Sequence, residues 1–252
     1  MSEQFSPAEV AKLKALIGSR TTHVIDVLDR SSSMQTGKDI TISTYNEQLD
    51  VMKQAQLRDG GKTTATMVIF SNTAEVAYKS QTLDKVEPLT VSSYRPEGMT
   101  ALYDAIGLAI ETAHTFEKDG DTAFLLRILT DGEENSSKKY NRDRIRSMIK
   151  ELNATGKWTV TISGPKGNID IFAEDLAIPK GNVTGFDPQS VQSRVSNKGM
   201  MVGSTSMYFA ARAAGATAVA DAYSSVSADL TPKETLVSPQ PAADASPSST
   251  NP

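Results

Sequence analysis

The chain has 252 residues, a formal net charge of −4 and no cysteine. The lack of cysteine excludes disulfides, thiolate catalysis and cysteine-based metal sites. A net charge of −4 gives no excess of basic residues of the kind that binds nucleic acid. No apolar run approaches the ~20 residues that a membrane-spanning helix requires. Because the N-terminus shows no cationic segment followed by an apolar core, we expect no secretory signal and a cytoplasmic location.

Helical and strand patterns alternate along the chain. Ser6-Pro7-Ala8-Glu9 is a capping box that predicts an N-terminal helix within residues 1–20, and His23 to Leu28 is an apolar strand. Further strands are expected over 64–70, 74–79, 123–130, 158–163 and 182–186, with helices around 42–52, 102–116, 145–152 and 170–176. We interpret this order as an α/β fold with a doubly wound, mostly parallel, Rossmann-like central sheet, helices on both faces and 74–79 as an antiparallel edge strand.

The domain organisation follows from changes in composition. Residues 21–188 are expected to form the α/β domain, and Asp187-Pro188 begins a further helix. The alanine-rich stretch from Met207 to Tyr223 is helix-prone, so we predict a C-terminal helical extension over 189–230. Residues 231–252 are rich in proline, serine and alanine and cannot bury enough apolar surface to offset their ordering entropy, so we predict a disordered tail.

Small polar residues follow the first predicted strand. Asp29, Ser31 and Ser33 stand at alternate positions and can turn toward one point above the sheet. In an open α/β sheet, ligands bind at the carboxyl ends of the strands, and hard oxygen ligands suit Mg²⁺ or Mn²⁺. Taken alone, the same residues commonly cap the helix that follows.

Asp26 lies within the strand, where a buried carboxylate would need partners. We expect the face of the sheet at Asp26 to be only loosely covered, and we do not assign this residue to the metal.

Two later stretches favour a metal site over capping. Gly98-Met99-Thr100 precedes an amphipathic helix, and Thr130-Asp131-Gly132 follows another hydrophobic strand. Each has a plainer explanation by itself, with Thr100 as an N-cap and Asp131 as a turn residue. Together with the first loop, however, they give the spaced set D-x-S-x-S, then T, then D.

This ordered set resembles the metal-ion-dependent adhesion site (MIDAS) of the von Willebrand factor A (vWA) domain family. Residues 94–107, 130–137 and 172–178 are similar to small, free-standing bacterial and phage vWA proteins, and the resemblance covers about residues 21–223. The family usually places glycine between the two serines, where this chain has Ser32. Glycine permits unusual backbone angles, so serine should be tolerated there if φ is negative.

The resemblance implies a site for Mg²⁺ or Mn²⁺ with five ligands: Asp29, Ser31, Ser33, Thr100 and Asp131. The two carboxylates balance a divalent cation, and the three hydroxyls add neutral oxygens, which leaves the metal electrophilic toward one more anionic oxygen. In the family, a glutamate or aspartate of a partner protein takes that place. The loops around the metal, with Met34, Met99 and Gly132, would contact the partner.

Two other functions stay open. A metal-dependent hydrolase or phosphotransferase would need a general base, but neither His23 nor His114 is near a candidate nucleophile in sequence. Aspartate-nucleophile phosphatases also place a second carboxylate two residues on, and here that position is Ser31. A structural or assembly protein with a purely stabilising metal would use the same ligands. We predict a non-enzymatic, metal-dependent protein-binding module that binds neither nucleic acid nor membrane; its oligomeric state is left open.

Overall fold

A six-stranded sheet forms the centre of the molecule in the computed structural model, which describes residues 6, 20–116, 121–219 and 221–223. The strands are β1 (Thr21–Asp29), β2 (Lys62–Phe70), β3 (Ala74–Thr82), β4 (Thr122–Leu129), β5 (Trp158–Pro165) and β6 (Val183–Phe186). Their order is β3-β2-β1-β4-β5-β6, and every pair is parallel except β2 with β3. The predicted fold class, including the antiparallel edge strand, is confirmed.

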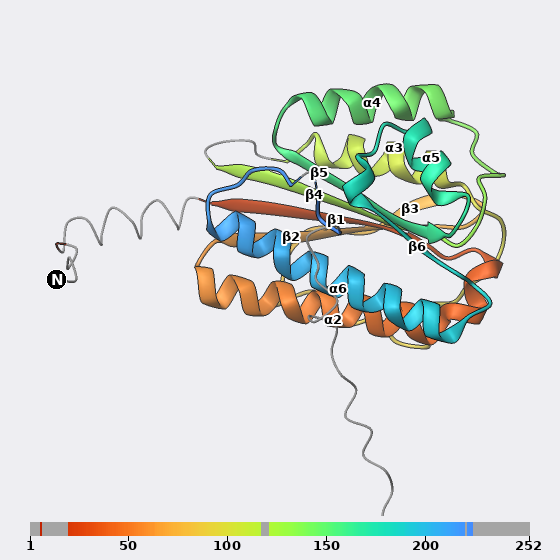
Figure 1. Ribbon diagram of the computed structural model, residues 1–252, viewed down its shortest axis with the longest axis horizontal. Helices are drawn as coiled ribbons and strands as arrows, with labels where there is room; N and C mark the ends of the chain where they lie inside the picture. Colours follow the sequence, from red (N-terminus) through yellow and green to blue (C-terminus); the bar gives the residue numbers. More distant parts are fainter. Residues whose placement is uncertain (1–5, 7–19, 117–120, 220, 224–252) are drawn as a thin grey trace, which may run out of the picture.

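Helices cover both faces of the sheet (Figure 1). One face carries α3 (Leu102–Ala113), α4 (Arg142–Ala154) and α5 (Ile169–Asp175), and the other carries α2 (Lys38–Asp59) and α6 (Val191–Ala213). The short 3₁₀ helices η1 (Ser32–Gly37) and η2 (Lys180–Asn182) complete the described elements. Within the described part of the chain, no helix combines the length and the apolarity that crossing a membrane requires.

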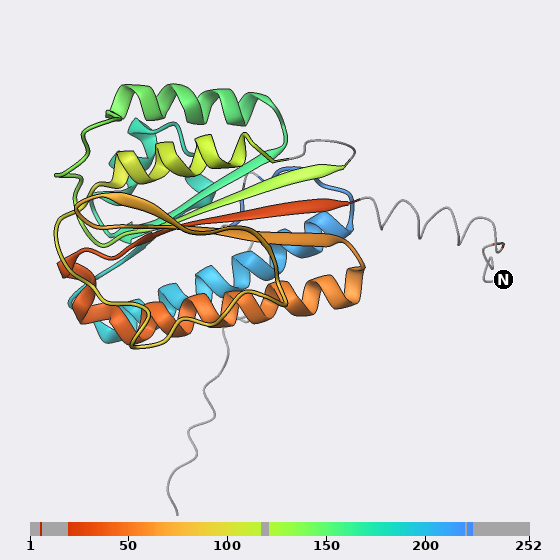
Figure 2. The same cartoon turned by 180° about the vertical axis from the view of Figure 1, so that it is seen from behind.

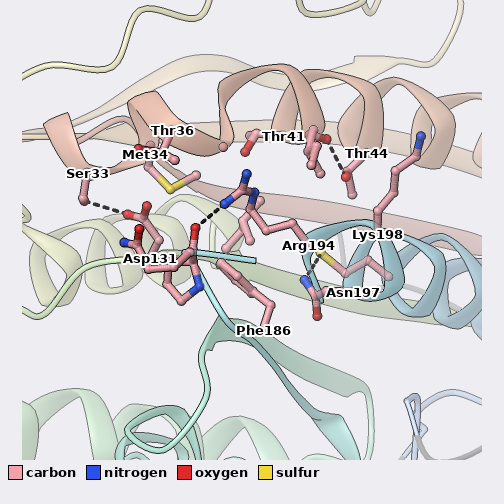
Figure 3. Close-up of a pocket in the computed structure, with 16 residues that line it drawn as sticks. Ser33, Met34, Thr36, Thr41, Thr44, Asp131, Phe186, Arg194, Asn197 and Lys198 are labelled. Atoms are coloured by element: carbon pink, nitrogen blue, oxygen red, sulfur yellow. Dashed lines mark hydrogen bonds between the residues drawn. The ribbon is translucent and has the colours of Figure 1, made fainter. Parts of the chain in front are cut away.

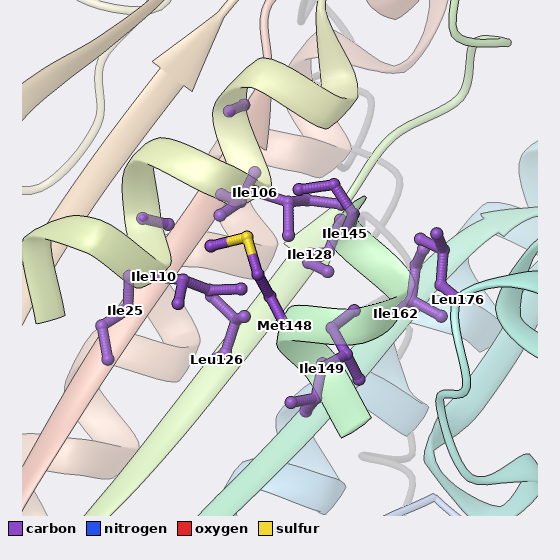
Figure 4. Packing of buried hydrophobic residues seen from close by; sticks show 14 of the residues in the cluster. Ile25, Ile106, Ile110, Leu126, Ile128, Ile145, Met148, Ile149, Ile162 and Leu176 are labelled. Atoms are coloured by element: carbon purple, nitrogen blue, oxygen red, sulfur yellow. The ribbon is translucent and has the colours of Figure 1, made fainter. Parts of the chain in front are cut away.

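The central strands are apolar because both faces of the sheet are covered. Successive side chains of β1 point to opposite faces. Ile25 and Val27 pack with α3 and α4 in one core cluster (Figure 4), whereas Val24 and Leu28 belong to the cluster beneath α2 and α6. This two-sided burial holds β1 rigidly in the middle of the sheet, and its carboxyl end is where the candidate site begins.

Asp26 lies on the tightly packed α2–α6 face of the sheet, so the expectation of a loosely covered face is wrong. Its neighbour across the strand pair is Arg127 of β4, and the two side chains form a buried ion pair with contacts of 2.7 and 3.0 Å. Arg127 also donates to Thr205 of α6 at 3.1 Å, and Gln48 of α2 donates to the same hydroxyl at 3.0 Å. Arg127 therefore ties α6 to the sheet, and the Thr205 hydroxyl connects α6 with α2.

The described C-terminal segment packs against the domain. Helix α6 lies along α2 and is continuous from Val191 to Ala213, so it ends before Tyr223, where the alanine-rich pattern had extended it. Gly215 follows with φ of +98°, a conformation that glycine adopts readily and that ends helices. The predicted N-terminal helix and the predicted tail over 231–252 lie outside the described residues.

Candidate metal centre

The five predicted ligands come from three loops at the carboxyl-terminal edge of the sheet, where the parallel strands end. Asp29 is the last residue of β1, and Asp131 follows β4 by two residues. Because β1 and β4 are parallel neighbours in register, with Leu28 opposite Leu129, their carboxyl ends lie side by side. The sheet topology alone therefore brings the two carboxylates to the same edge.

A long connection brings Thr100 to this edge from the end of β3, which lies beside the beginning of β2. Residues 83–101 run along α2 (Figure 2), where Asn46 exchanges hydrogen bonds of 3.0 and 2.8 Å with the main chain of Leu89. The main-chain N–H of Ser32 then donates to Gly98 at 3.1 Å, which joins the first loop to this one. Thr100 is 3 % exposed just before α3.

The predicted ligands lie within contact of one another. The hydroxyls of Ser31 and Ser33 are 3.0 Å apart, and Ser33 donates to Oδ1 of Asp131 at 2.6 Å. A Cβ added to Gly132 would stand 3.0 Å from the Thr100 hydroxyl and 3.4 Å from that of Ser33. The space in front of Gly132 is thus bounded by hydroxyl groups of two different loops.

Asp29 is fully buried and is held by neutral donors. Its Oδ1 accepts from the main-chain N–H of Ser31 at 2.7 Å, and its Oδ2 accepts from the Thr130 hydroxyl at 2.6 Å. Tyr94 donates to its main-chain oxygen at 2.5 Å. Burial raises the pKa of the Asp29 carboxyl to about 6, although the hydrogen bonds from Thr130 and Ser31 oppose the rise. A buried carboxylate among neutral groups is costly, so a cation beside it would stabilise the charged form.

Asp131 is half-buried at the outer side of the site. Burial raises the pKa of its carboxyl, while the hydrogen bond from Ser33 and the positive charge of Arg194 on α6 act in the opposite direction. Arg194 was not among the predicted site residues, because nothing in its helical sequence context connects it with a loop more than sixty positions earlier.

The donor set fits a hard divalent cation. It consists of two carboxylates and three hydroxyls, which suits Mg²⁺ or Mn²⁺ better than Zn²⁺, whose common protein ligands are thiolates and imidazoles. Across the described residues there is no group of three or more histidine, aspartate or glutamate side chains that could hold a metal ion. A metal at this edge would therefore depend on the hydroxyl oxygens.

Amide and carboxylate side chains hold the loops of the site, and the sequence patterns had not identified them. The amide oxygen of Asn135 accepts from the main-chain N–H of Thr100 at 2.9 Å, and that of Asn72 accepts from Met99 at 2.8 Å. Glu134 accepts from the N–H of Tyr103 at 2.9 Å, in the first turn of α3. Thr100 is not the N-cap of α3, whose cap position is Ala101, so its hydroxyl has no capping role there.

The residues predicted to contact a partner differ in accessibility. Met99 is 51 % exposed at the rim of the site, and Gly132 is half-buried. Met34 is 3 % exposed and lines a cavity between α2 and α6. Ser32 is exposed in η1 without a positive φ, so serine is compatible with the position where the vWA family usually has glycine.

Two cavities meet at Asp131. One has a volume of about 380 Å³ and lies between the beginnings of α2 and α6 (Figure 3). The other, of about 530 Å³, lies between α3 and α5 and is lined by Leu102, Tyr103, Glu133, Ile169 and Phe172, among others. The candidate metal site is therefore flanked by concave surface on both sides.

Comparisons with known proteins bear on the fold. No family model matches the chain, and neither does any curated protein. The minor pilin PilB of Streptococcus sanguinis aligns over 78 % of this chain and 62 % of its own, with a TM-score of 0.51 and 10 % identity. Its likeness supports the α/β architecture alone.

The similar structures include vWA proteins and a MIDAS-bearing protein. A vWA protein from Catenulispora acidiphila aligns over 73 % of this chain and 43 % of its own, with 16 % identity and a TM-score of 0.44. Proximal thread matrix protein 1 from the mussel byssus, in a structure whose MIDAS motif holds zinc, aligns over 76 %, with 17 % identity and a TM-score of 0.49. This chain spans only about 46 % of the mussel protein's length.

Proposed function

We propose that this chain is a vWA-type module that binds a partner protein through a divalent metal ion, Mg²⁺ or Mn²⁺. The observation that carries the proposal is Asp29, a fully buried carboxylate with neutral donors around it, beside a second carboxylate and three hydroxyls. A buried charge of this kind needs a compensating cation.

Each residue has a defined part in the proposed site. Asp29 and Asp131 neutralise the two charges of the cation, and Ser31, Ser33 and Thr100 supply neutral oxygens. A cation bound there would supply an electrophilic centre for one more anionic oxygen. A glutamate or aspartate side chain of the partner would provide that oxygen, with the exposed Met99 beside it.

The two histidines support a binding function over catalysis. His23 is buried between the rings of Phe116 and Phe124 and contacts the Thr64 hydroxyl at 2.7 Å. His114 caps the carboxyl end of α3, the end opposite Thr100. Neither histidine is placed to act as a general base at the candidate metal site.

The test of the metal site is calorimetric titration of Mg²⁺ and Mn²⁺ into chelator-treated protein. We expect saturable binding by the wild type and none by Asp29→Asn, which keeps the shape of the side chain but removes its charge. Glu133→Gln is the matched control, because Glu133 is an exposed carboxylate two residues from Asp131. Equal binding by wild type and Asp29→Asn would overturn the assignment.

The test of ligand capture uses a short peptide with one glutamate. We expect it to bind in Mg²⁺ and to be released by chelator. A purely stabilising metal would instead raise the unfolding temperature without any carboxylate binding, and that result would favour the structural alternative.

A further inference from the structure

The cavity between α2 and α6 has a polar wall and an apolar floor. Figure 3 shows it extending from Ser33 and Asp131 along the facing sides of the two helices. The floor is formed by Met34, Leu129, Phe186 and Met201. Threonine hydroxyls of the first turns of α2 and polar side chains of α6 line the rest. A volume of about 380 Å³ is enough for an amino-acid side chain of a bound segment.

Arg194 is the positively charged side chain of this cavity that lies toward the candidate metal site. It reaches from α6 toward Asp131 and α2 (Figure 3), and one of its terminal nitrogens donates to the main-chain oxygen of Pro188. Its Nε is buried without a hydrogen-bond partner among the described residues. Because a buried N–H without an acceptor is unfavourable, an acceptor that enters the cavity would be stabilised.

The surrounding charges favour an anionic occupant. Lys198, one turn further along α6, already pairs with Glu47 at 2.6 Å. The amino ends of α2 and α6 both lie at this cavity, and each contributes a partial positive charge. Asp131 is the one carboxylate among the residues that line the cavity. When its charge neutralises a bound cation, no other lining residue offers a carboxylate to pair with the guanidinium of Arg194.

We propose that the α2–α6 cavity receives a second acidic side chain of the same partner, which pairs with Arg194 while the first carboxylate binds at the metal site. This inference rests on the proposed function. It identifies the partner class as a segment with two closely spaced acidic residues. Arg194 selects for the second acid because a guanidinium offers a carboxylate charge-assisted hydrogen bonds.

The test compares two sets of short peptides in Mg²⁺ by NMR titration. One set contains two glutamates separated by up to two glycines; in the other, the second glutamate is replaced by glutamine. We expect the best two-glutamate peptide to bind the wild type about tenfold more tightly than its glutamine counterpart, the factor expected of one charge-assisted hydrogen bond. The Nε–H resonance of Arg194 should shift when the two-glutamate peptide is added and should not shift with its glutamine counterpart.

Variants assign the effect to Arg194. At saturating Mg²⁺, Arg194→Gln should bind the two-glutamate peptide no more tightly than its glutamine counterpart, and Arg194→Lys should restore part of the advantage. Lys198→Gln is the matched control and should keep the advantage. The Nε–H resonance is measured on the wild type, so the proposal stays testable even if Arg194→Gln does not fold.

The outcomes separate this inference from the proposed function. Equal affinities for the two peptides, with binding still dependent on Mg²⁺, would overturn the inference and leave the proposed function standing. An advantage that persists in Arg194→Gln would also overturn it, because the second carboxylate would then bind elsewhere. If no peptide binds in a metal-dependent manner, both proposals fail.

Discussion

Ser33 and Asp131 are joined by a hydrogen bond of 2.6 Å, although 98 positions separate them in the chain. Ser33 belongs to the loop after β1, and Asp131 to the loop after β4. Both strands end at the same edge of the sheet, so the bond connects two loops that local sequence patterns describe independently. The hydroxyl that makes this bond is also a proposed metal ligand, so its removal tests the site directly.

Replacing Ser33 with alanine should weaken Mg²⁺ binding with little effect on folding. Ser33 is exposed, so its loss removes an oxygen ligand without opening a core cavity. We expect a loss of about tenfold or more in affinity by calorimetry, and an unfolding temperature close to that of the wild type. Ser32→Ala is the control, because Ser32 is also exposed and lies next to Ser33 in the same helix; an equal loss in both variants would contradict the prediction.

Gly132→Ala should block the metal site without straining the backbone. Gly132 has no positive φ, and the new methyl group would lie 3.0 Å from the Thr100 hydroxyl and 3.4 Å from that of Ser33. We expect Mg²⁺ binding to be lost, while the free energy of unfolding without metal changes by about 1 kcal/mol or less. Denaturant titration and calorimetry measure the two effects. Gly61→Ala, whose methyl group would make ordinary contacts of 3.5 Å or more, should bind Mg²⁺ normally.

Asp29 should make the metal-free protein less stable as the pH rises from about 4 to about 6. Burial raises its pKa from 3.8 to about 6, so in this interval the folded state binds more protons than the unfolded state, and the free energy of unfolding falls with pH. The shift corresponds to about 3 kcal/mol at most. Asp29→Asn should lack this contribution, and urea titrations of both proteins across the interval measure the difference.

The same raised pKa predicts the pH dependence of metal binding. The proton on Asp29 competes with the cation, so Mg²⁺ affinity should increase as the pH rises through about 6 and level off above it. Calorimetry between pH 5 and 8 measures this profile. An affinity independent of pH over that range would show that Asp29 does not hold the metal.

Breaking the buried ion pair should destabilise the fold strongly. Arg127→Met leaves the Asp26 carboxylate buried without its partner, which should cost about 3–5 kcal/mol of unfolding free energy in denaturant titrations. The double variant Asp26→Leu with Arg127→Met removes both charges and should recover most of that loss. A double variant as unstable as the single one would show that the hydrogen bonds to α6, and not the unpaired charge, account for the effect.

Local patterns predicted the fold class well, and they placed the candidate ligands Asp29 and Asp131 after neighbouring strands. Strand period, helix period and breaker residues are local properties, and a chain that alternates strands with helices forms a parallel sheet. Polar residues that follow such parallel strands lie at one edge of the sheet, so Asp29 and Asp131 could be grouped from the sequence alone. The edge strand β3 was recognisable because a short turn joins it to β2.

Other features depend on contacts between segments that no local pattern connects. Asp26 is explained by Arg127 on the neighbouring strand, Thr100 is held by Asn135, and Arg194 of α6 points toward Asp131. Each partner is more than thirty positions away, and its side chain type alone is equally typical of a solvent-facing residue. The sequence by itself determined that polar residues stand at the ends of the strands. Only the tertiary structure decided which charged side chains lie opposite them, because the packing of α6 and the loops brings together residues that are far apart in the chain.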